Sequence, residues 1–93
     1  SMLETMPKKL VAWGEQRGRQ EGRQEGRQEG IRDSIIEVLK EKFQQVPQDI
    51  SEMLGSIAQA ADLAILLRKA AVIQSLKEFK KVLIEMRQKQ QKL

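Results

Sequence analysis

The 93-residue sequence contains no cysteine, histidine or tyrosine, and its only aromatic residues are Trp13, Phe43 and Phe79. The lack of cysteine excludes disulfides and thiolate metal sites, and the lack of histidine removes the commonest general base and zinc ligand. No apolar run approaches the roughly 20 residues that span a bilayer, and no signal peptide is visible. We therefore expect a cytoplasmic protein that is neither disulfide-rich, zinc-dependent nor membrane-spanning.

The length and the charge distribution narrow the possibilities further. Ninety-three residues form at most one small domain, which leaves little room for a deep internal cleft. The formal net charge of +4 divides into +1 over residues 1–30, −1 over residues 31–74 and +4 over residues 75–93. The positive excess therefore lies in the C-terminal segment.

Apolar residues recur at helical spacing and predict an all-α fold. Thr5 and Pro7 favour a helix start, and no proline follows until Pro47, so one helix can run from about Pro7 to Gln45. That helix would be roughly 57 Å long at 1.5 Å per residue. Residues 40–42 lie off its apolar face. The apolar face comprises Ile31, Ile35, Val38, Leu39 and Phe43.

Three shorter helices are predicted after the long one, because the residue before Pro47 avoids the α conformation. Pro47 can open the first of them, Asp62 is expected to cap the second, and Ser75 with Glu78 forms a capping-box pattern for the third. We expect residues 88–93 to fray. The apolar faces are Ile50, Met53, Leu54 and Ile57; then Leu63, Leu66, Leu67, Ala70 and Ile73; then Leu76, Phe79, Val82, Leu83 and Met86.

These patterns divide the chain into two parts. Residues 1–30 form a glycine-repeat helical arm, and residues 31–93 form a small helical bundle with a basic C-terminal tail. The short helices share one core with the end of the long helix, since none of them can bury its apolar face alone.

Glycine occupies every fourth position from Gly14 to Gly30, and the tetrapeptide Gly-Arg-Gln-Glu repeats from Gly18 onward. Each glycine inside a helix costs about 1 kcal/mol relative to alanine, so the five glycines penalise an isolated helix by roughly 5 kcal/mol. Glycine at this spacing is favourable where a second backbone packs closely, as in small-xxx-small interfaces. The repeat therefore predicts a partner helix. The predicted seam comprises Met6, Leu10, Gly14, Gly18, Gly22, Gly26, Gly30, Ser34 and Val38.

The charged residues of the repeat flank this seam on opposite sides. With glycine at 0°, the arginines lie at about 100°, the glutamines at about 200° and the glutamates at about 300° around the helix. A parallel two-fold partner sets the arginines of one chain against the glutamates of the other, whereas an antiparallel partner opposes arginine with arginine. The charges therefore favour a parallel homodimer. We expect its helices to cross with a right-handed twist, because residues four apart advance about 40° around a 3.6-residue helix. The alternative is that this glycine-rich polar segment is a flexible tether.

No set of residues has the pattern of a catalytic or cofactor site. The serines lack a histidine base, the glycines are not followed by the Lys-Ser/Thr of a phosphate loop, and the carboxylates lie on polar helix faces. Asp33, Glu37 and Glu41 share one face at i, i+4 spacing and could bind a hard cation, but we expect a solvated polar face. We expect a non-enzymatic chain without a metal or cofactor.

The basic C-terminal segment fits a polyanion better than any other part of the chain. Its positive side chains can contact a phosphate backbone non-specifically, although the sequence offers few aromatic side chains on which bases could stack. A basic amphipathic helix can also lie on an anionic membrane, but Phe79 and Val82 are needed for the core, so no membrane partner is expected. A nucleic-acid-binding adaptor and a remnant without function are the alternatives to an association module. The candidate nucleic-acid contacts are Lys77, Lys80, Lys81, Arg87 and Lys89.

Several segments together resemble a known family. They are the Gly-Arg-Gln-Glu repeat, Ile-Arg-Asp-Ser-Ile-Ile-Glu-Val-Leu at residues 31–39 and onward to Phe43, Val46-Pro47, residues 63–70, and Ser-Leu-Lys-Glu-Phe at residues 75–79. Over residues 14 to about 84 they resemble the C-terminal tail of the recombination-promoting nuclease and transposase family of the PD-(D/E)XK superfamily, especially its cyanobacterial members. The repeat alone also resembles segments of unrelated proteins such as the flagellar export ATPase regulator, so the later apolar pattern is the more specific part.

The resemblance implies oligomerisation and transfers no catalytic residue. In that family the metal-binding acids of the nuclease core precede the glycine repeat, where this chain has only residues 1–13. Gln44 and Gln45 depart from the family's usual glycine after the phenylalanine. The implied role is to hold two copies of a nuclease domain, joined in cis or in trans, side by side.

Overall fold

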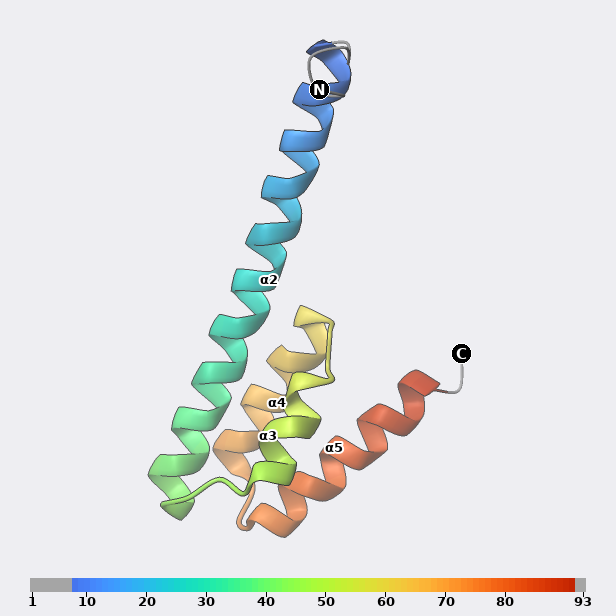
Figure 1. The fold of residues 1–93 in the computed structure, drawn as a ribbon. Helices are drawn as coiled ribbons and strands as arrows, with labels where there is room; N and C mark the ends of the chain where they lie inside the picture. Colours follow the sequence, from blue (N-terminus) through green and yellow to red (C-terminus); the bar gives the residue numbers. More distant parts are fainter. Residues whose placement is uncertain (1–7, 92–93) are drawn as a thin grey trace.

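The computed structural model describes residues 8–91, with side chains described for residues 17–90, and it consists of four α-helices (Figure 1). The helices are α2 (Lys8–Phe43), α3 (Gln48–Gly55), α4 (Ala60–Val72) and α5 (Leu76–Gln91). Residues 8–91 contain no strand, so the predicted all-α fold with a long first helix is confirmed. The predictions for Thr5, Met6 and Pro7 lie outside the described residues.

Helix α2 is a long rod, and the three shorter helices gather around its C-terminal half (Figure 1). Helix α4 packs against α2 over most of the length of α4. Helix α5 contacts α4 and α3 on the side away from α2. The N-terminal half of α2 extends beyond the bundle, and residues 17–27 are exposed. The described part of the arm therefore makes little contact with the rest of its own chain.

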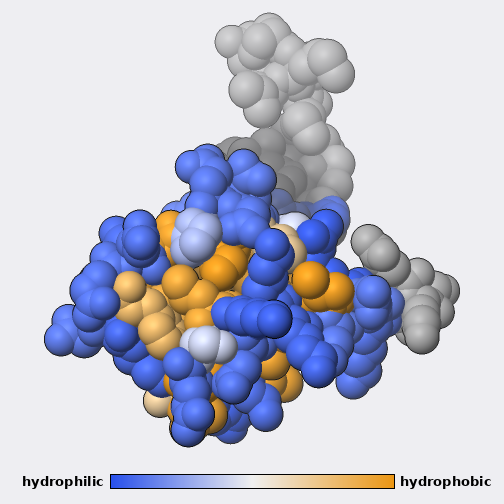
Figure 2. All heavy atoms as spheres, turned by 90° about the horizontal axis from the view of Figure 1, so that it is seen from below, coloured by the Kyte–Doolittle hydropathy of each residue, from blue (hydrophilic) through white to orange (hydrophobic). Residues whose placement is uncertain are grey.

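The core lies between α2, α3, α4 and α5 and is built from the predicted apolar faces. Its members are at most 9% exposed, and Figure 2 shows apolar side chains gathered between hydrophilic ones at the end of the bundle away from the arm. Full burial of each leucine, isoleucine or phenylalanine stabilises the fold by about 1.5–3 kcal/mol. The core comprises Ile35, Leu39, Ile50, Met53, Leu54, Ile57, Leu63, Leu66, Ala70, Ile73, Phe79 and Leu83.

Some predicted core residues lie at the margin and are only half-buried. They still pack against the buried cluster. They are partly exposed because an apolar helix stripe wider than the contact between two helices leaves its edges in contact with water. These residues are Ile31, Val38, Phe43, Leu67, Leu76, Val82 and Met86.

The predicted helix ends are correct within a few residues, with two corrections. Helix α2 ends at Phe43 and not at Gln45, because Gln44 adopts the left-handed conformation with φ 69°. Helix α4 begins at Ala60 with Gln59 as its N-cap, and the first turn closes through Leu63 N–H to the Gln59 carbonyl at 3.1 Å. Asp62 therefore lies inside the first turn and does not cap the helix as predicted.

The start of α5 forms a capping box that is shifted by one residue. Glu78 N–H donates to Ser75 Oγ at 3.2 Å, as predicted. The Glu78 carboxylate accepts from the N–H of Gln74, at 3.1 Å, one residue before the expected donor.

The C-terminal end of α5 is more ordered than predicted. The helix continues to Gln91, and the side-chain amide of Gln90 donates to the Asp62 carboxylate at 2.8 Å. This bond joins the end of α5 to the start of α4, so the expected fraying from residue 88 is wrong for residues 88–91.

Candidate association surface on helix α2

The glycines of the arm lie on an open helix surface. A Cβ atom added at Gly18, Gly22, Gly26 or Gly30 would meet no atom within 4 Å, apart from its own helix backbone and chain neighbours. The packing of this single chain therefore does not require glycine at any of these positions. Each glycine costs the helix about 1 kcal/mol relative to alanine. Nothing in the packing of one chain offsets this cost.

The glycine row turns away from the bundle where the two come closest. At 3.6 residues per turn, Gly26 and Gly30 lie about 160° around the α2 axis from the direction midway between Ile35 and Leu39, the α2 side chains in the core. The row is therefore on the far side of α2 from the three short helices. A helix of a second chain can therefore approach Gly26 and Gly30 without meeting the bundle of the first chain.

The two ends of the predicted seam differ from its middle. Ser34 is half-buried, and its hydroxyl donates to the Gly30 carbonyl at 3.0 Å. Val38 is half-buried and packs against the core, so the row reaches the edge of the bundle there. Met6 lies outside the described residues, and Leu10 and Gly14 belong to α2 but to the part whose side chains and surroundings are not described.

The charged rows beside the glycines are exposed and weakly engaged within the chain. Arg17 Nε lies 3.3 Å from Glu21 Oε1, and both side chains are 63% exposed. An exposed i, i+4 pair of this kind contributes only about 0.3–0.5 kcal/mol. The side chains of Glu25, Arg27 and Glu29 form no hydrogen bond or ion pair among the described residues. These three side chains can therefore turn to a partner at little loss.

Two basic residues on α2 have a role that the sequence analysis missed. The Arg32 guanidinium donates to the carbonyls of Leu54, at 3.1 Å, and Ile57, at 2.6 Å, at the end of α3. The Lys42 ammonium donates to carbonyls at the end of α4. The acceptors are Ala70 and Ala71, both at 3.1 Å, and Ile73 at 2.5 Å.

These contacts follow from the electrostatics of a helix end. The last carbonyls of a helix have no intrahelical donor, and the aligned peptide dipoles make this end negative, so a nearby cation stabilises it. Arg32 serves α3 and Lys42 serves α4 in this way. The prediction that Lys42 lies off the apolar face is wrong, because Lys42 lies only about 40° around α2 from the direction midway between Ile35 and Leu39. Its contacts with α4 hold α2 against the bundle and thereby set the direction of the arm.

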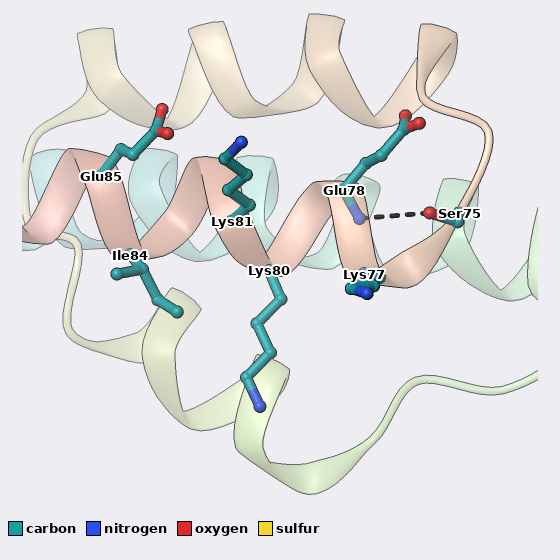
Figure 3. Close-up of a pocket in the computed structure, with 7 residues that line it drawn as sticks. All are labelled: Ser75, Lys77, Glu78, Lys80, Lys81, Ile84 and Glu85. Atoms are coloured by element: carbon teal, nitrogen blue, oxygen red, sulfur yellow. Dashed lines mark hydrogen bonds between the residues drawn. The ribbon is translucent and has the colours of Figure 1, made fainter.

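Two of the candidate nucleic-acid contacts on α5, Lys80 and Lys81, lie beside carboxylates. Lys80 Nζ lies 2.6 Å from Asp49 Oδ2 on α3, and its hydrogen bond lowers the pKa of the Asp49 carboxyl below the ordinary value of 3.8. Figure 3 shows Lys81 between Glu78 and Glu85, all pointing toward α4, while Lys80 points toward α3. The open groove of about 630 Å³ that these residues line with Ile84 is thus mixed in charge.

Other kinds of site find little support in the described residues. Asp33, Glu37 and Glu41 are exposed, and within the described chain no three histidine, cysteine, aspartate or glutamate residues are grouped to hold a metal ion. None of the described helices is long and apolar enough to cross a membrane. No family model, curated protein or solved structure matches this chain.

Proposed function

We propose that this chain is a non-catalytic helical association module that pairs with a second copy, in parallel, through the glycine row of α2. The observation that carries the proposal is the open space at Gly18, Gly22, Gly26 and Gly30. These four residues penalise the arm helix by roughly 4 kcal/mol relative to alanine. A close backbone partner is the physical circumstance in which their lack of a Cβ becomes favourable.

The surroundings of the row support a second copy as the partner. Arginine and glutamate rows border the glycines on opposite sides, and each is like-charged at i, i+4 spacing within its own helix, which is mildly unfavourable. A parallel copy brings each row next to its opposite. The bundle lies on the other side of α2 and leaves the approach open.

The proposed biological role follows the resemblance of the sequence to nuclease and transposase tails. In this role the paired arms hold two copies of a nuclease domain, joined in cis or in trans, side by side. The resemblance alone supports this second step.

The competing proposal is a nucleic-acid-binding adaptor that uses α5. The interleaved carboxylates and the Lys80–Asp49 pair give it less support. Strongly salt-dependent binding to an arbitrary duplex, lost when Lys77, Lys80 and Lys81 are changed to glutamine, would favour it.

The direct test is the solution mass of matched variants, measured by light scattering with helicity followed by circular dichroism. Gly18→Leu with Gly22→Leu fills the seam, whereas Gln20→Leu with Gln24→Leu places the same two leucines about 160° away on the helix. We expect a dimer for the wild type and the glutamine variant, and a monomer for the glycine variant.

The helicity of the glycine variant makes the test sharper. Leucine favours a helix over glycine by nearly 1 kcal/mol per residue, so an isolated arm gains helicity in this variant. Loss of helicity together with loss of the dimer therefore identifies the partner as the source of the arm's order. A wild-type monomer at high concentration, or a glycine variant that remains dimeric, would refute the proposal.

A further inference from the structure

Residues 18–27 are the described part of α2 with the least support from their own chain. Their side chains are exposed, whereas Gln28 and Ile31 are half-buried and Ile35 and Leu39 are fully buried. A helix in a globular protein owes most of its stability to the packing of one face against the rest of the fold. In a single chain that contribution begins at about residue 28 and is absent from residues 18–27.

The sequence of this segment does not make up for the missing packing. A good helix former extends an existing helix with an equilibrium constant of about 1–1.6, and glycine lowers this constant about fivefold relative to alanine. Each unit of one glycine and three good helix formers therefore extends α2 with an overall constant of about 0.3–1.3. The helical form of residues 18–27 is thus weakly favoured at best, even though α2 already has a folded turn in the bundle from which to grow.

The polar contacts of the segment add little to its helix stability. The Arg23 Nε–H donates to the Arg19 carbonyl at 3.4 Å, and this exposed bond competes with water. The exposed ion pair of Glu21 with Arg17 changes the helix equilibrium by about twofold. The arginine and glutamate rows each place like charges four residues apart, which is mildly unfavourable within one helix.

We propose that residues 18–27 become stably helical only when two copies pair, so that folding of this segment and association are one coupled step. The inference rests on the proposed parallel dimer and names what regulates it. A partner backbone along the glycine row supplies the packing that a single chain lacks. Part of the free energy of pairing is then used to order the segment, which makes the pair weaker and more readily reversible than its contacts alone would give.

The coupling makes the helix stability of the segment control the strength of the pair. A helix that is already formed in the unpaired chain changes both states equally, so its stability has no effect on the dissociation constant. A helix that forms on pairing changes only the dimer. Gln20 and Gln24 are suited to separate these cases, because they lie about 160° around α2 from the neighbouring glycines. Both are exposed, and their side chains have no hydrogen bond or ion pair among the described residues.

The test compares two double variants that remove the same two side chains. Gln20→Ala with Gln24→Ala raises the helix propensity by about 1.5-fold per residue, and Gln20→Gly with Gln24→Gly lowers it by about threefold per residue. A dimer contains two substituted residues in each chain. We therefore expect the alanine variant to lower the Kd about fivefold and the glycine variant to raise it about 80-fold.

Analytical ultracentrifugation of the full chain gives the Kd of each variant, and hydrogen exchange above and below the Kd of the wild type follows the backbone amides. We expect the amides of residues 18–27 to be protected in the dimer and to lose this protection on dilution. The amides of Leu39 and Phe79, which lie in the core of each bundle, should remain protected at both concentrations.

The outcomes separate the coupling from the pairing itself. Opposite shifts of the Kd in the two variants support the coupling, because a lost glutamine contact would weaken both dimers. A wild-type dimer whose Kd is unchanged in both variants would overturn the coupling and leave the dimer intact, and so would a Kd that rises equally in both. A wild type that stays monomeric at high concentration would overturn the proposed function and the coupling with it.

Discussion

The most specific stability prediction from this fold concerns the ammonium group of Lys42. It donates to three carbonyls at the C-terminal end of α4, the helix that packs most extensively on α2. Lys42→Met keeps most of the aliphatic chain and removes the donors and the charge. The carbonyls then lose their cap and the favourable interaction between the cation and the helix dipole.

The magnitude follows from what is lost. A hydrogen bond to a charged group is worth about 1.5–3 kcal/mol net, and a cation at a helix C-terminus about 0.3–2 kcal/mol. Because Lys42 remains largely exposed to water, we take the lower part of this range and expect a loss of about 1.5 kcal/mol. For a domain of this size that corresponds to a fall in Tm of about 6–12 °C.

The matched control is Lys40→Met. Lys40 is in the same last turn of α2 and is exposed, and its side chain has no hydrogen bond or ion pair among the described residues. The two variants thus have the same net charge and the same effect on the dipole of α2. Urea unfolding followed by circular dichroism, at one fixed chain concentration, should separate them by about 1.5 kcal/mol. Equal unfolding free energies for the two variants would show that the cap on α4 contributes nothing.

Three further predictions concern single contacts. Arg32→Met should lower the unfolding free energy by about 1–2 kcal/mol, and hydrogen exchange should show faster opening at the end of α3, because two of its carbonyls lose a charged donor. Gln44→Gly should raise the unfolding free energy by about 0.5–1 kcal/mol, since glycine adopts a positive φ without strain, and the control Gln45→Gly should give no gain in the same urea titration. The Lys80 hydrogen bond holds the pKa of Asp49 below its ordinary value, so the pair adds stability above the unfolded pKa of Asp49 and loses it as the pH falls through the lower folded pKa. Lys80→Gln should therefore raise the Asp49 pKa in a carboxyl NMR titration, and an unchanged pKa would show that the pair does not persist in solution.

The apolar core could be predicted from the sequence because burial leaves a periodic mark. Ile35 and Leu39 of α2 are four residues apart, as are Phe79 and Leu83 of α5, and all four are fully buried as predicted. In a chain this short, a helix with such an apolar face has few surfaces other than the common core against which to bury it. The half-buried residues at the edge of the core were harder to predict, since the same helical spacing describes residues at the centre and at the edge of an apolar stripe.

The polar contacts could be predicted only where donor and acceptor are close in sequence. The bond of Ser75 to the Glu78 N–H is local and was predicted. Arg32 and Lys42 instead bind backbone carbonyls 22 to 31 residues away. Every residue has a carbonyl, so nothing in the sequence marks which ones will lie at the end of a neighbouring helix.

For the candidate surface, the sequence contains the glycine row and its charged borders, while the structure adds the surroundings of the row. Helical phase alone places Val38 both on the apolar face and on the seam. Only the packed bundle shows that Val38 lies at the edge of the core, whereas Gly26 and Gly30 are exposed on the other side.

The continuity of α2 also bears on how a glycine-rich arm can become helical at all. Starting a helix in solution is unfavourable by a factor of about 10³, or roughly 4 kcal/mol, because several residues must be fixed before the first hydrogen bond forms. Residues 31–43 are already held in helical form by the core, so the arm needs only to propagate from an existing turn. The bundle thus acts as a template whose contribution is similar in size to the penalty of four glycines. Melting of the arm would begin at the end far from the bundle and proceed toward the bundle, and the proposed pairing with a second copy would close in the opposite direction.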